Sequence, residues 1–195
     1  MYYLLLENYI KELLKENKEY IKKINIFDFD DTLFKTAEKP VNWTKKDGFW
    51  YNSEESVNPL YYKKNIDTYW ISDTVNKVKE SMEDLESLTV LCTARSALPE
   101  VIHTTNSLLR QKGLMFDDNR LYYKTKNYQK LGKEGTPKYK ADVAKSLLNT
   151  YSFCKELHFW EDKQENLDAV QQMIDANNSI NPNRQILFVP HIVQA

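Results

Sequence analysis

Three aspartates, Asp28, Asp30 and Asp31, follow the apolar run Ile24–Phe27. β-branched and aromatic residues in this run predict a buried strand, and the acids come where that strand should end. Carboxylates two residues apart lie on the same side of an extended backbone, so Asp28 and Asp30 can converge on one reacting centre. Because unpaired buried charge is costly, we expect a cation or a reaction at this place.

The string from Asp28 to Thr32 reads Asp-Phe-Asp-Asp-Thr and resembles Asp-x-Asp-x-Thr, the first motif of the haloacid dehalogenase (HAD) superfamily of phosphotransferases. The resemblance implies that Asp28 is the nucleophile, which takes up a phosphoryl group as an aspartyl phosphate. It implies that Asp30 protonates the leaving oxygen and later activates the hydrolytic water. It also implies that Asp28 and the backbone carbonyl of Asp30 hold Mg²⁺, which prefers oxygen ligands.

Further HAD motifs have candidates along the chain in the expected order. Thr93 matches the second motif, a Ser or Thr whose hydroxyl binds the transferring phosphoryl group. The fourth motif supplies acids that complete the Mg²⁺ site with Asp28. Asp162 is our first choice for this ligand, and Glu161 and Asn166 are secondary choices.

Two lysines, Lys138 and Lys140, compete for the third motif, a lysine near a helix start that neutralises the charge of the phosphoryl group and the aspartate. Helical spacing places Lys140 on the apolar face, with Ala144, Leu147 and Leu148. Lys138 aligns instead with a polar face, made of Asp142, Lys145 and Asn149. We therefore assign the role to Lys140 and keep Lys138 in reserve.

Strands and helices must bring these residues together. After the first strand, the pattern predicts strands at Leu88–Cys92, Leu121–Lys124, Glu156–Trp160 and Gln185–Val189. It predicts helices at Ser72–Asp84 with Ser72 as N-cap, from Pro99 to Gly113, from Thr136 (N-cap) to about Tyr151, and at Glu165–Ala176. Strands that alternate with helices predict a parallel sheet covered on both faces, with ligands beyond the carboxyl ends of the strands.

We divide the chain into an N-terminal amphipathic helix, residues 1–23, and a HAD-like phosphatase domain, residues 24–195. The helix is indicated by apolar residues at helical spacing, namely Leu5, Leu6, Tyr9, Ile10, Leu13 and Leu14. The domain carries an irregular, aromatic-rich insertion at about 34–70 and a basic insertion at about 113–135. The expected fold is an α/β, Rossmann-like, three-layer HAD fold with a small or irregular cap.

Beyond the superfamily, the chain resembles the HAD-type domain of Swiss Army Knife RNA-repair proteins from about Ile24 to Ala176. The strings that carry this resemblance are Phe27–Phe34 with Thr36, Pro40 and Trp43, Gly48–Trp50, Trp70, Leu88–Arg95, Gly113-Leu114 with Phe116-Asp117, Lys138–Lys140 and Glu161-Asp162. The fourth motif of such domains reads Glu-Asp-Arg-x-x-His, whereas Lys163 and Asn166 stand in the last two places here. The sequence has neither a P-loop nor a ligase-type motif, so we expect a stand-alone phosphatase rather than a multi-step repair enzyme.

The basic insertion bears on the substrate. Its cations are interleaved with aromatic residues, in the order Arg120, Tyr122, Tyr123, Lys124, Lys126, Tyr128, Lys130 and Lys133. Lysines contact phosphates and aromatic rings stack on bases, which is the combination used for single-stranded nucleic acid. A solvated loop is an equally open interpretation. Our candidates for substrate binding are Arg95, Thr32, Lys124 and Lys126.

We expect a Mg²⁺-dependent phosphomonoesterase that acts on a phosphorylated substrate, an RNA or DNA end. The same chemistry on nucleotides or other small phosphometabolites remains an alternative, as does a catalytically idle nucleic-acid-binding module. The net charge of −1 gives no global attraction to nucleic acid or membranes. Two cysteines form no disulfide framework and suit the reducing cytoplasm. We find no signal peptide and no run near the ~20 apolar residues of a membrane span.

Overall fold

The computed structural model describes residues 18–44, 50–58, 62 and 65–194 of the 195-residue chain. In this part, one sheet has the strand order β3-β2-β1-β4-β5. Its strands are β1 (Lys23–Phe27), β2 (Ser87–Ser96), β3 (Leu121–Lys124), β4 (Glu156–Glu161) and β5 (Leu187–Ile192). Every pair of neighbouring strands is parallel, which confirms the predicted parallel α/β sheet.

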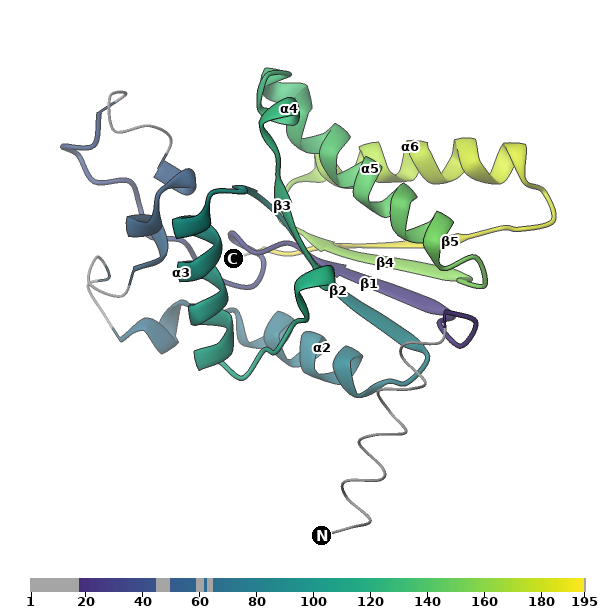
Figure 1. Ribbon diagram of the computed structural model, residues 1–195, viewed down its shortest axis with the longest axis horizontal. Helices are drawn as coiled ribbons and strands as arrows, with labels where there is room; N and C mark the ends of the chain where they lie inside the picture. The colour runs from purple at the N-terminus through teal and green to yellow at the C-terminus, as the bar shows by residue number, and fades with distance from the viewer. Residues whose placement is uncertain (1–17, 45–49, 59–61, 63–64, 195) are drawn as a thin grey trace, which may run out of the picture.

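Helices cover both faces of the sheet (Figure 1). One face is covered by α5 (Gly135–Thr150) and α6 (Gln164–Ile180), and the other by α2 (Ser72–Glu83) and α3 (Pro99–Gln111). A short helix, α4 (Lys126–Gln129), precedes α5. The predicted three-layer arrangement is therefore confirmed for the described residues. No helix in these ranges is both long and apolar enough to cross a membrane.

The central strand β1 explains the position of the acids that follow it. Its side chains alternate, since Ile24 and Ile26 pack in the core under α5 and α6, while Phe27 packs in the core with α2 and α3. β1 pairs with β2 on one side and with β4 on the other. The carboxyl end of β1 therefore lies between the ends of the strands that carry Thr93 and Glu161.

Two predicted boundaries next to the site are wrong. β2 continues to Ser96 instead of ending at Cys92, and its pairing with β3 shifts register between Thr93 and Ser96. Such an irregularity re-aims side chains locally, because the ladder is interrupted there. Helix α5 begins at Gly135 with Glu134 as N-cap, so Thr136 already lies inside the helix.

Other boundaries shift by a few residues. Ser72 is the first residue of α2 and Ile71 is the N-cap. Helix α6 continues to Ile180, beyond the predicted end at Ala176. Strand β5 starts at Leu187 rather than Gln185, because the Asn178 side chain bonds both the N–H and the C=O of Ile186, each at 2.9 Å. That side chain takes the hydrogen bonds that a neighbouring strand would otherwise make.

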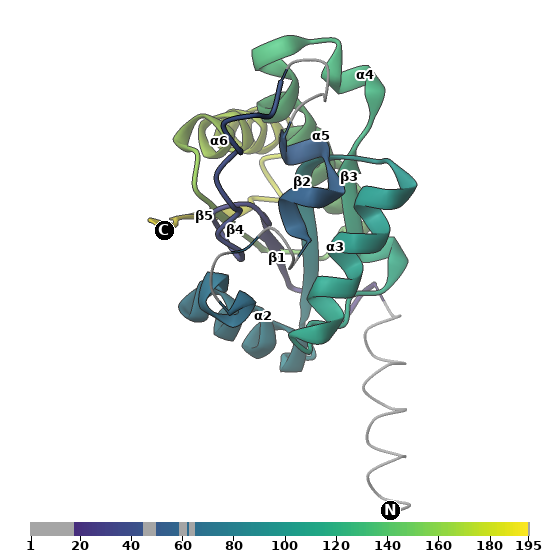
Figure 2. The ribbon, with the colours of Figure 1, turned by 90° about the vertical axis from the view of Figure 1, so that its left-hand side faces the viewer.

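The segment from Phe34 to Trp70 lies between β1 and α2, and its two ends are paired with each other. The Lys35 N–H donates to Tyr69 O at 2.7 Å, and the Ile71 N–H donates to Leu33 O at 2.9 Å. Between these ends, the described residues form short 3₁₀ helices at Trp50–Asn52, Glu54–Val57 and Ile66–Tyr69. Figure 2 shows the 50–57 part beside α3 and the end of β2.

The predicted N-terminal helix falls mostly outside the described residues, because the described part starts at Lys18. Within this part, residues 18–20 form a turn and Lys23 already belongs to β1.

Candidate active site

A cavity of about 640 Å³ opens where the carboxyl ends of β1, β2 and β4 meet. Residues that line it include Asp28, Asp30, Lys140, Glu161 and Asp162. The first two follow β1, Lys140 comes from α5, and the other two stand at the end of β4. Ligands of open α/β sheets bind at this edge, so these side chains lie where chemistry is expected.

Asp28 and Lys140 form a buried ion pair inside the cavity wall. Asp28 Oδ2 lies 3.0 Å from Lys140 Nζ, and the two side chains are 6% and 1% exposed. Lys140 also donates to the Oε2 atom of Glu161, which is fully buried. Burial raises the pKa of Asp28 well above its usual value, and the Lys140 ammonium opposes this rise. A positively charged partner is thus needed to keep the Asp28 carboxylate ionised.

The charge on Lys140 is itself secured by its two partners. Burial alone would lower the pKa of Lys140, but the carboxylates of Asp28 and Glu161 outweigh it and raise that pKa. Lys138 lies elsewhere, since its side chain is exposed and pairs with Asp142 one turn along the same helix at 3.0 Å. The structure thus brings Lys140, and not Lys138, to Asp28.

Three acids can share one cation. Asp28, Glu161 and Asp162 each offer a carboxylate oxygen, and these atoms lie within 4.8 Å of one another. Asp28 Oδ1 is buried and has no hydrogen-bond partner among the described residues. An orphaned carboxylate oxygen beside further carboxylates fits a hard cation such as Mg²⁺.

The two acids at the end of β4 differ in how many of their carboxylate oxygens are already bonded to the protein. Glu161 is committed on both oxygens, since Oε2 binds Lys140 and Oε1 accepts the Lys163 N–H at 3.2 Å. Asp162 is partly exposed to the cavity and pairs with the ammonium of Lys163 at 2.7 Å. Asn166 contributes a buried Oδ1 atom that has no partner in the described part of the chain.

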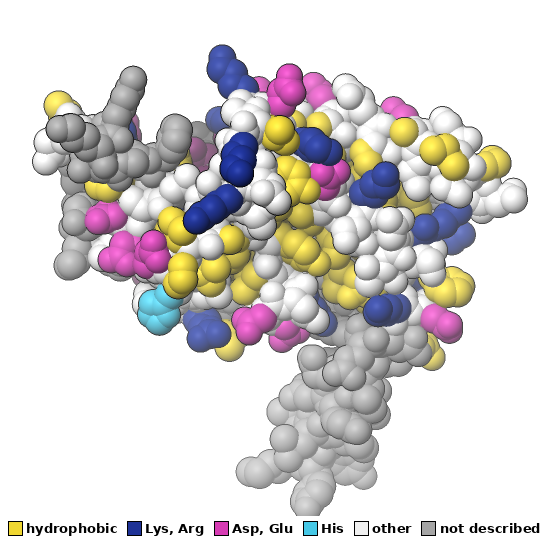
Figure 3. Space-filling model, turned by 45° about the horizontal axis from the view of Figure 1, so that its top comes forward, with side chains coloured by type: hydrophobic (Ala, Val, Ile, Leu, Met, Phe, Trp, Pro, Cys, Tyr) yellow, Lys and Arg dark blue, Asp and Glu magenta, His cyan; other side chains and the backbone are white. Residues whose placement is uncertain are grey.

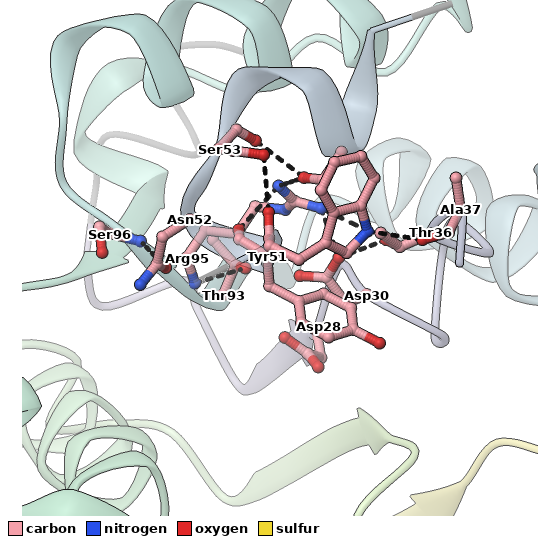
Figure 4. A network of polar contacts seen from close by, with 12 residues as sticks. Asp28, Asp30, Thr36, Ala37, Tyr51, Asn52, Ser53, Thr93, Arg95 and Ser96 are labelled. Atoms are coloured by element: carbon pink, nitrogen blue, oxygen red, sulfur yellow. Dashed lines mark hydrogen bonds and ion pairs between the residues drawn. The ribbon is translucent and has the colours of Figure 1, made fainter. Parts of the chain in front are cut away.

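Asp30 is held by a second cation, Arg95. Arg95 Nη2 lies 2.6 Å from Asp30 Oδ1, and the Thr36 hydroxyl donates to the same oxygen (Figure 4). Arg95 Nη1 donates to Ser56 Oγ at 2.7 Å and to the carbonyl of Tyr51 at 2.9 Å. Arg95, which was predicted to bind substrate, is among the residues that line the cavity, and its side chain is fully buried and bonded to protein acceptors.

Thr36 and Ser56 received no role from the sequence. Thr36 stands in one of the strings that carry the family resemblance, but nothing in its spacing connects it with Asp30. Ser56 is 39 residues from Arg95 and reaches it only through the fold. A signal for these contacts would have to come from the three-dimensional arrangement.

The two predicted threonines are buried rather than exposed in the cavity. Thr93 and Thr32 are 0% exposed, and neither is among the residues that line the cavity. Thr93 Oγ1 accepts the N–H of Arg95 at 3.2 Å, while Thr32 Oγ1 has no partner among the described residues. Thr93 is enclosed because β2 continues past it. Between Asp30 and Thr32, Asp31 adopts a left-handed conformation (φ 54°) that turns the chain away from the strand.

Of the two lysines predicted to bind substrate, Lys124 lines the cavity and Lys126 does not. Lys124 donates to Thr136 Oγ1 at 2.9 Å, and no carboxylate of the described residues lies within ion-pair distance of it. Burial lowers its pKa, and the charge of Lys140 adds to this effect. Lys133 also lines the cavity.

The tyrosines of the basic segment are engaged elsewhere. Tyr122 and Tyr128 pack against the core under α5 and α6, and Tyr123 is 8% exposed with its hydroxyl bonded to Asn106 at 2.7 Å. The aromatic residue that lines the cavity is Tyr51, which is half-exposed. Burial and the carboxylates of Asp31 and Asp30 raise the pKa of the Tyr51 hydroxyl.

Comparison with known proteins gives one match. Residues 41–194 match a family described as HAD domain family 1 in Swiss Army Knife RNA repair proteins, as the sequence strings had indicated. The matched range includes Thr93, Lys140 and Asp162, and it begins after Asp28 and Asp30. No curated protein and no solved structure gives a significant match.

Proposed function

Since the chain belongs to HAD domain family 1 of Swiss Army Knife RNA repair proteins, we propose that it hydrolyses phosphomonoesters through an aspartyl phosphate on Asp28. One observation carries the proposal. Asp28 stands at the end of the central strand in a cavity that also exposes Asp30 and Asp162, with one oxygen paired to Lys140 and the other without a partner among the described residues. This arrangement supports a nucleophile, an acid–base group and a charge-neutralising cation acting on one phosphoryl group.

The reaction has two steps. In the first, the Asp28 carboxylate attacks phosphorus, the bond from phosphorus to the leaving oxygen breaks, and Asp30 donates a proton to that oxygen. In the second, Asp30 takes a proton from water, the water oxygen attacks phosphorus, and the bond to Asp28 breaks to release inorganic phosphate. Lys140 favours the ionised form of Asp28 before attack and offsets negative charge that builds up on the phosphoryl group.

Asp28, Asp162 and the backbone carbonyl of Asp30 would hold Mg²⁺, with Glu161 as a secondary ligand. The orphaned Asp28 Oδ1 supports this assignment, because a buried carboxylate oxygen without a partner is costly. When bound, the ion supplies positive charge that the transferring phosphoryl group needs.

For the substrate, we favour the phosphorylated end of an RNA or another polynucleotide. The cavity of about 640 Å³ falls in the range of roughly 300–1,000 Å³ that suits an organic ligand larger than phosphate. Lys124 lines it without a carboxylate partner among the described residues, so it is available to a further phosphate of the substrate. Membership of a family of domains from RNA repair proteins agrees with this choice.

The decisive assay measures Mg²⁺-dependent phosphate release from 3′- and 5′-phosphorylated oligonucleotides, from mononucleotides and from an aryl phosphate. We expect release from oligonucleotides to be the most efficient. Release from small esters alone would replace the polynucleotide substrate by a phosphometabolite, and no release from any of them would refute the hydrolase.

Asp28→Asn is expected to abolish turnover of every substrate, because the amide is a poor nucleophile at phosphorus. The variant keeps the volume of the side chain, so its thermal melting curve provides the folding control. Substantial residual turnover by a folded Asp28→Asn protein would contradict the assignment of Asp28.

A further inference from the structure

Resting on the proposed role of Asp30 in proton transfer, we propose that Arg95 is a positioning residue that holds Asp30 for this step. The position of Arg95 depends in turn on the segment Trp50–Val57, which accepts hydrogen bonds from its guanidinium group. Arg95 is among the residues that line the cavity, and both of its terminal nitrogens are bonded to protein acceptors. It acts through Asp30.

One carboxylate oxygen of Asp30 is bonded to the protein, and the other is available for the proton transfer. Oδ1 receives hydrogen bonds from Arg95 Nη2 at 2.6 Å and from the Thr36 hydroxyl. No described residue bonds Oδ2, and the Asp30 side chain lines the cavity with 17% of its surface exposed. The carboxylate is therefore fixed at one oxygen, and the other oxygen is left to exchange the proton with the leaving group and with water.

Arg95 is itself fixed from several sides. Its side chain is 0% exposed, and Asp30 is its one carboxylate partner in the described part of the chain. The Phe29 ring lies 5.3 Å from the guanidinium carbon, and the irregularity in β2 lies at the same place. A buried guanidinium needs its carboxylate and its remaining acceptors, so Arg95 and Asp30 depend on each other for their positions.

Thr36 Oγ1 also accepts from Arg95 Nη2, at 3.3 Å, and the acceptors of Nη1 come from the segment Trp50–Val57. Arg95 Nη1 donates to Ser56 Oγ and to Tyr51 O, and the Ser56 hydroxyl donates onward to Ser53 O at 2.8 Å. Figure 4 shows this chain of contacts running from the segment through Arg95 to Asp30. The segment thus supports the acid–base group without contributing a side chain to the proton transfer.

The test compares two substrates of nearly equal size, 4-nitrophenyl phosphate and benzyl phosphate. The nitrophenolate leaves without help, whereas the benzyl alkoxide must be protonated as it leaves. In Arg95→Met, kcat/KM for benzyl phosphate should fall by about 100-fold or more, the usual contribution of a general acid, while the value for 4-nitrophenyl phosphate should fall by less than about fivefold. kcat/KM is the right measure, because it covers only the steps up to the departure of the leaving group.

Arg184→Met is the matched control. Arg184 Nη2 donates to the carbonyls of Leu148 and Tyr151 near the end of α5, so its loss removes a partly buried arginine without touching Asp30. Both substrates should be turned over as by the wild type. If Arg95→Met lowers kcat/KM for both esters equally, the positioning role of Arg95 is wrong, but the proposed hydrolase activity is not contradicted. A wild type inactive on both esters and on oligonucleotides would overturn the proposed function and this inference together.

If Arg95→Met does not fold, the positioning of Asp30 can be tested with two smaller changes at Thr36. Thr36→Val removes one of the two hydrogen bonds to Asp30 Oδ1 at constant shape, and Thr36→Ser keeps it. We expect a leaving-group-dependent loss of about tenfold in Thr36→Val and recovery in Thr36→Ser. Ser56→Ala should show the same selectivity to a smaller degree, since it removes an acceptor of Arg95. Equal behaviour of Thr36→Val and Thr36→Ser on both esters would contradict the inference.

Discussion

At the scale of single residues, the site is a pair of carboxylates held by a pair of buried cations. Asp28 is paired with Lys140, and Asp30 is paired with Arg95. Each carboxylate has its own cation, and the two cations come from different elements, α5 and β2. Lys140 supports ionisation of Asp28, whereas Arg95 supports orientation of Asp30.

The two neighbouring lysines of α5 should therefore differ sharply. Lys140→Met is expected to lower kcat/KM by roughly 10²–10³-fold, the typical loss on removing one charge-stabilising donor. Lys138→Met should stay within about twofold of the wild type, because Lys138 is exposed and pairs with Asp142 on the surface of the same helix. Phosphate release by the two variants, purified side by side, checks this. Equal losses in both would argue against the special place of Lys140.

Part of this site was predictable from the sequence because strand periodicity and helix periodicity fix directions. The spacing of Asp28 and Asp30 indicated convergence at a strand end, and the apolar face of the following helix separated Lys140 from Lys138. The role of Arg95 was not predictable. Its partners Thr36 and Ser56 lie in an irregular segment that has no period from which a direction could be inferred.

At the scale of elements, the start of α5 is set by close approach to the chain before it. A Cβ atom on Gly135 would lie 2.0 Å from the backbone oxygen of Tyr128, which is far inside contact distance. The first turn of α5 can therefore pack against α4 only if this position has no side chain. The sequence indicated an N-cap at Thr136 instead, because a Thr-Pro pair is a strong helix-start signal. The close packing of α4 against α5 produces no pattern in the neighbouring residues that could have shown the earlier start.

Gly135→Ala should destabilise the protein by about 1–3 kcal/mol, as expected when backbone must move to relieve an overlap. Glu134→Ala, at the exposed preceding residue, serves as the control and should have little effect. Equilibrium urea unfolding of both variants measures the difference in free energy. If Gly135→Ala unfolds at the same urea concentration as the wild type, the close approach of α4 and α5 is not present in solution.

At the scale of the whole molecule, the parallel sheet and the three layers followed from the alternation of strands and helices, whereas the strand order β3-β2-β1-β4-β5 comes from the structure. The distribution of basic side chains on the surface bears on the proposed nucleic-acid substrate. On the face shown in Figure 3, Lys and Arg side chains lie scattered among hydrophobic and acidic ones rather than forming one continuous patch. Among the lysines that line the cavity, Lys140 and Lys163 are paired with carboxylates, so the lysines suited to contact further phosphates are Lys124 and Lys133.

Binding of an oligonucleotide should therefore depend on salt only moderately. With about 0.7 per phosphate neutralised on a single strand, two lysines give a slope near −1.4 for log affinity against log salt concentration. Fluorescence anisotropy of a 3′-phosphorylated oligonucleotide with the Asp28→Asn protein measures the slope, which Lys124→Met should about halve. A slope near zero would exclude these phosphate contacts, and one of −4 or steeper would require a much wider basic surface.

The paired ends of the Phe34–Trp70 segment bear on how such a protein can diversify. The chain closes on itself between Leu33 and Ile71, after β1 and before α2, so the length and content of the segment between these ends can change without altering the register of β1 with β2. Such changes must keep the contacts that the segment makes with β2, namely the acceptors of Arg95 and the Asn52 side chain that accepts the Ser96 N–H at 3.1 Å. A replacement segment that reshapes the cavity mouth must still provide a hydroxyl and a carbonyl for the Arg95 guanidinium. A change in this segment can therefore alter the choice of substrate and the positioning of Asp30 at the same time.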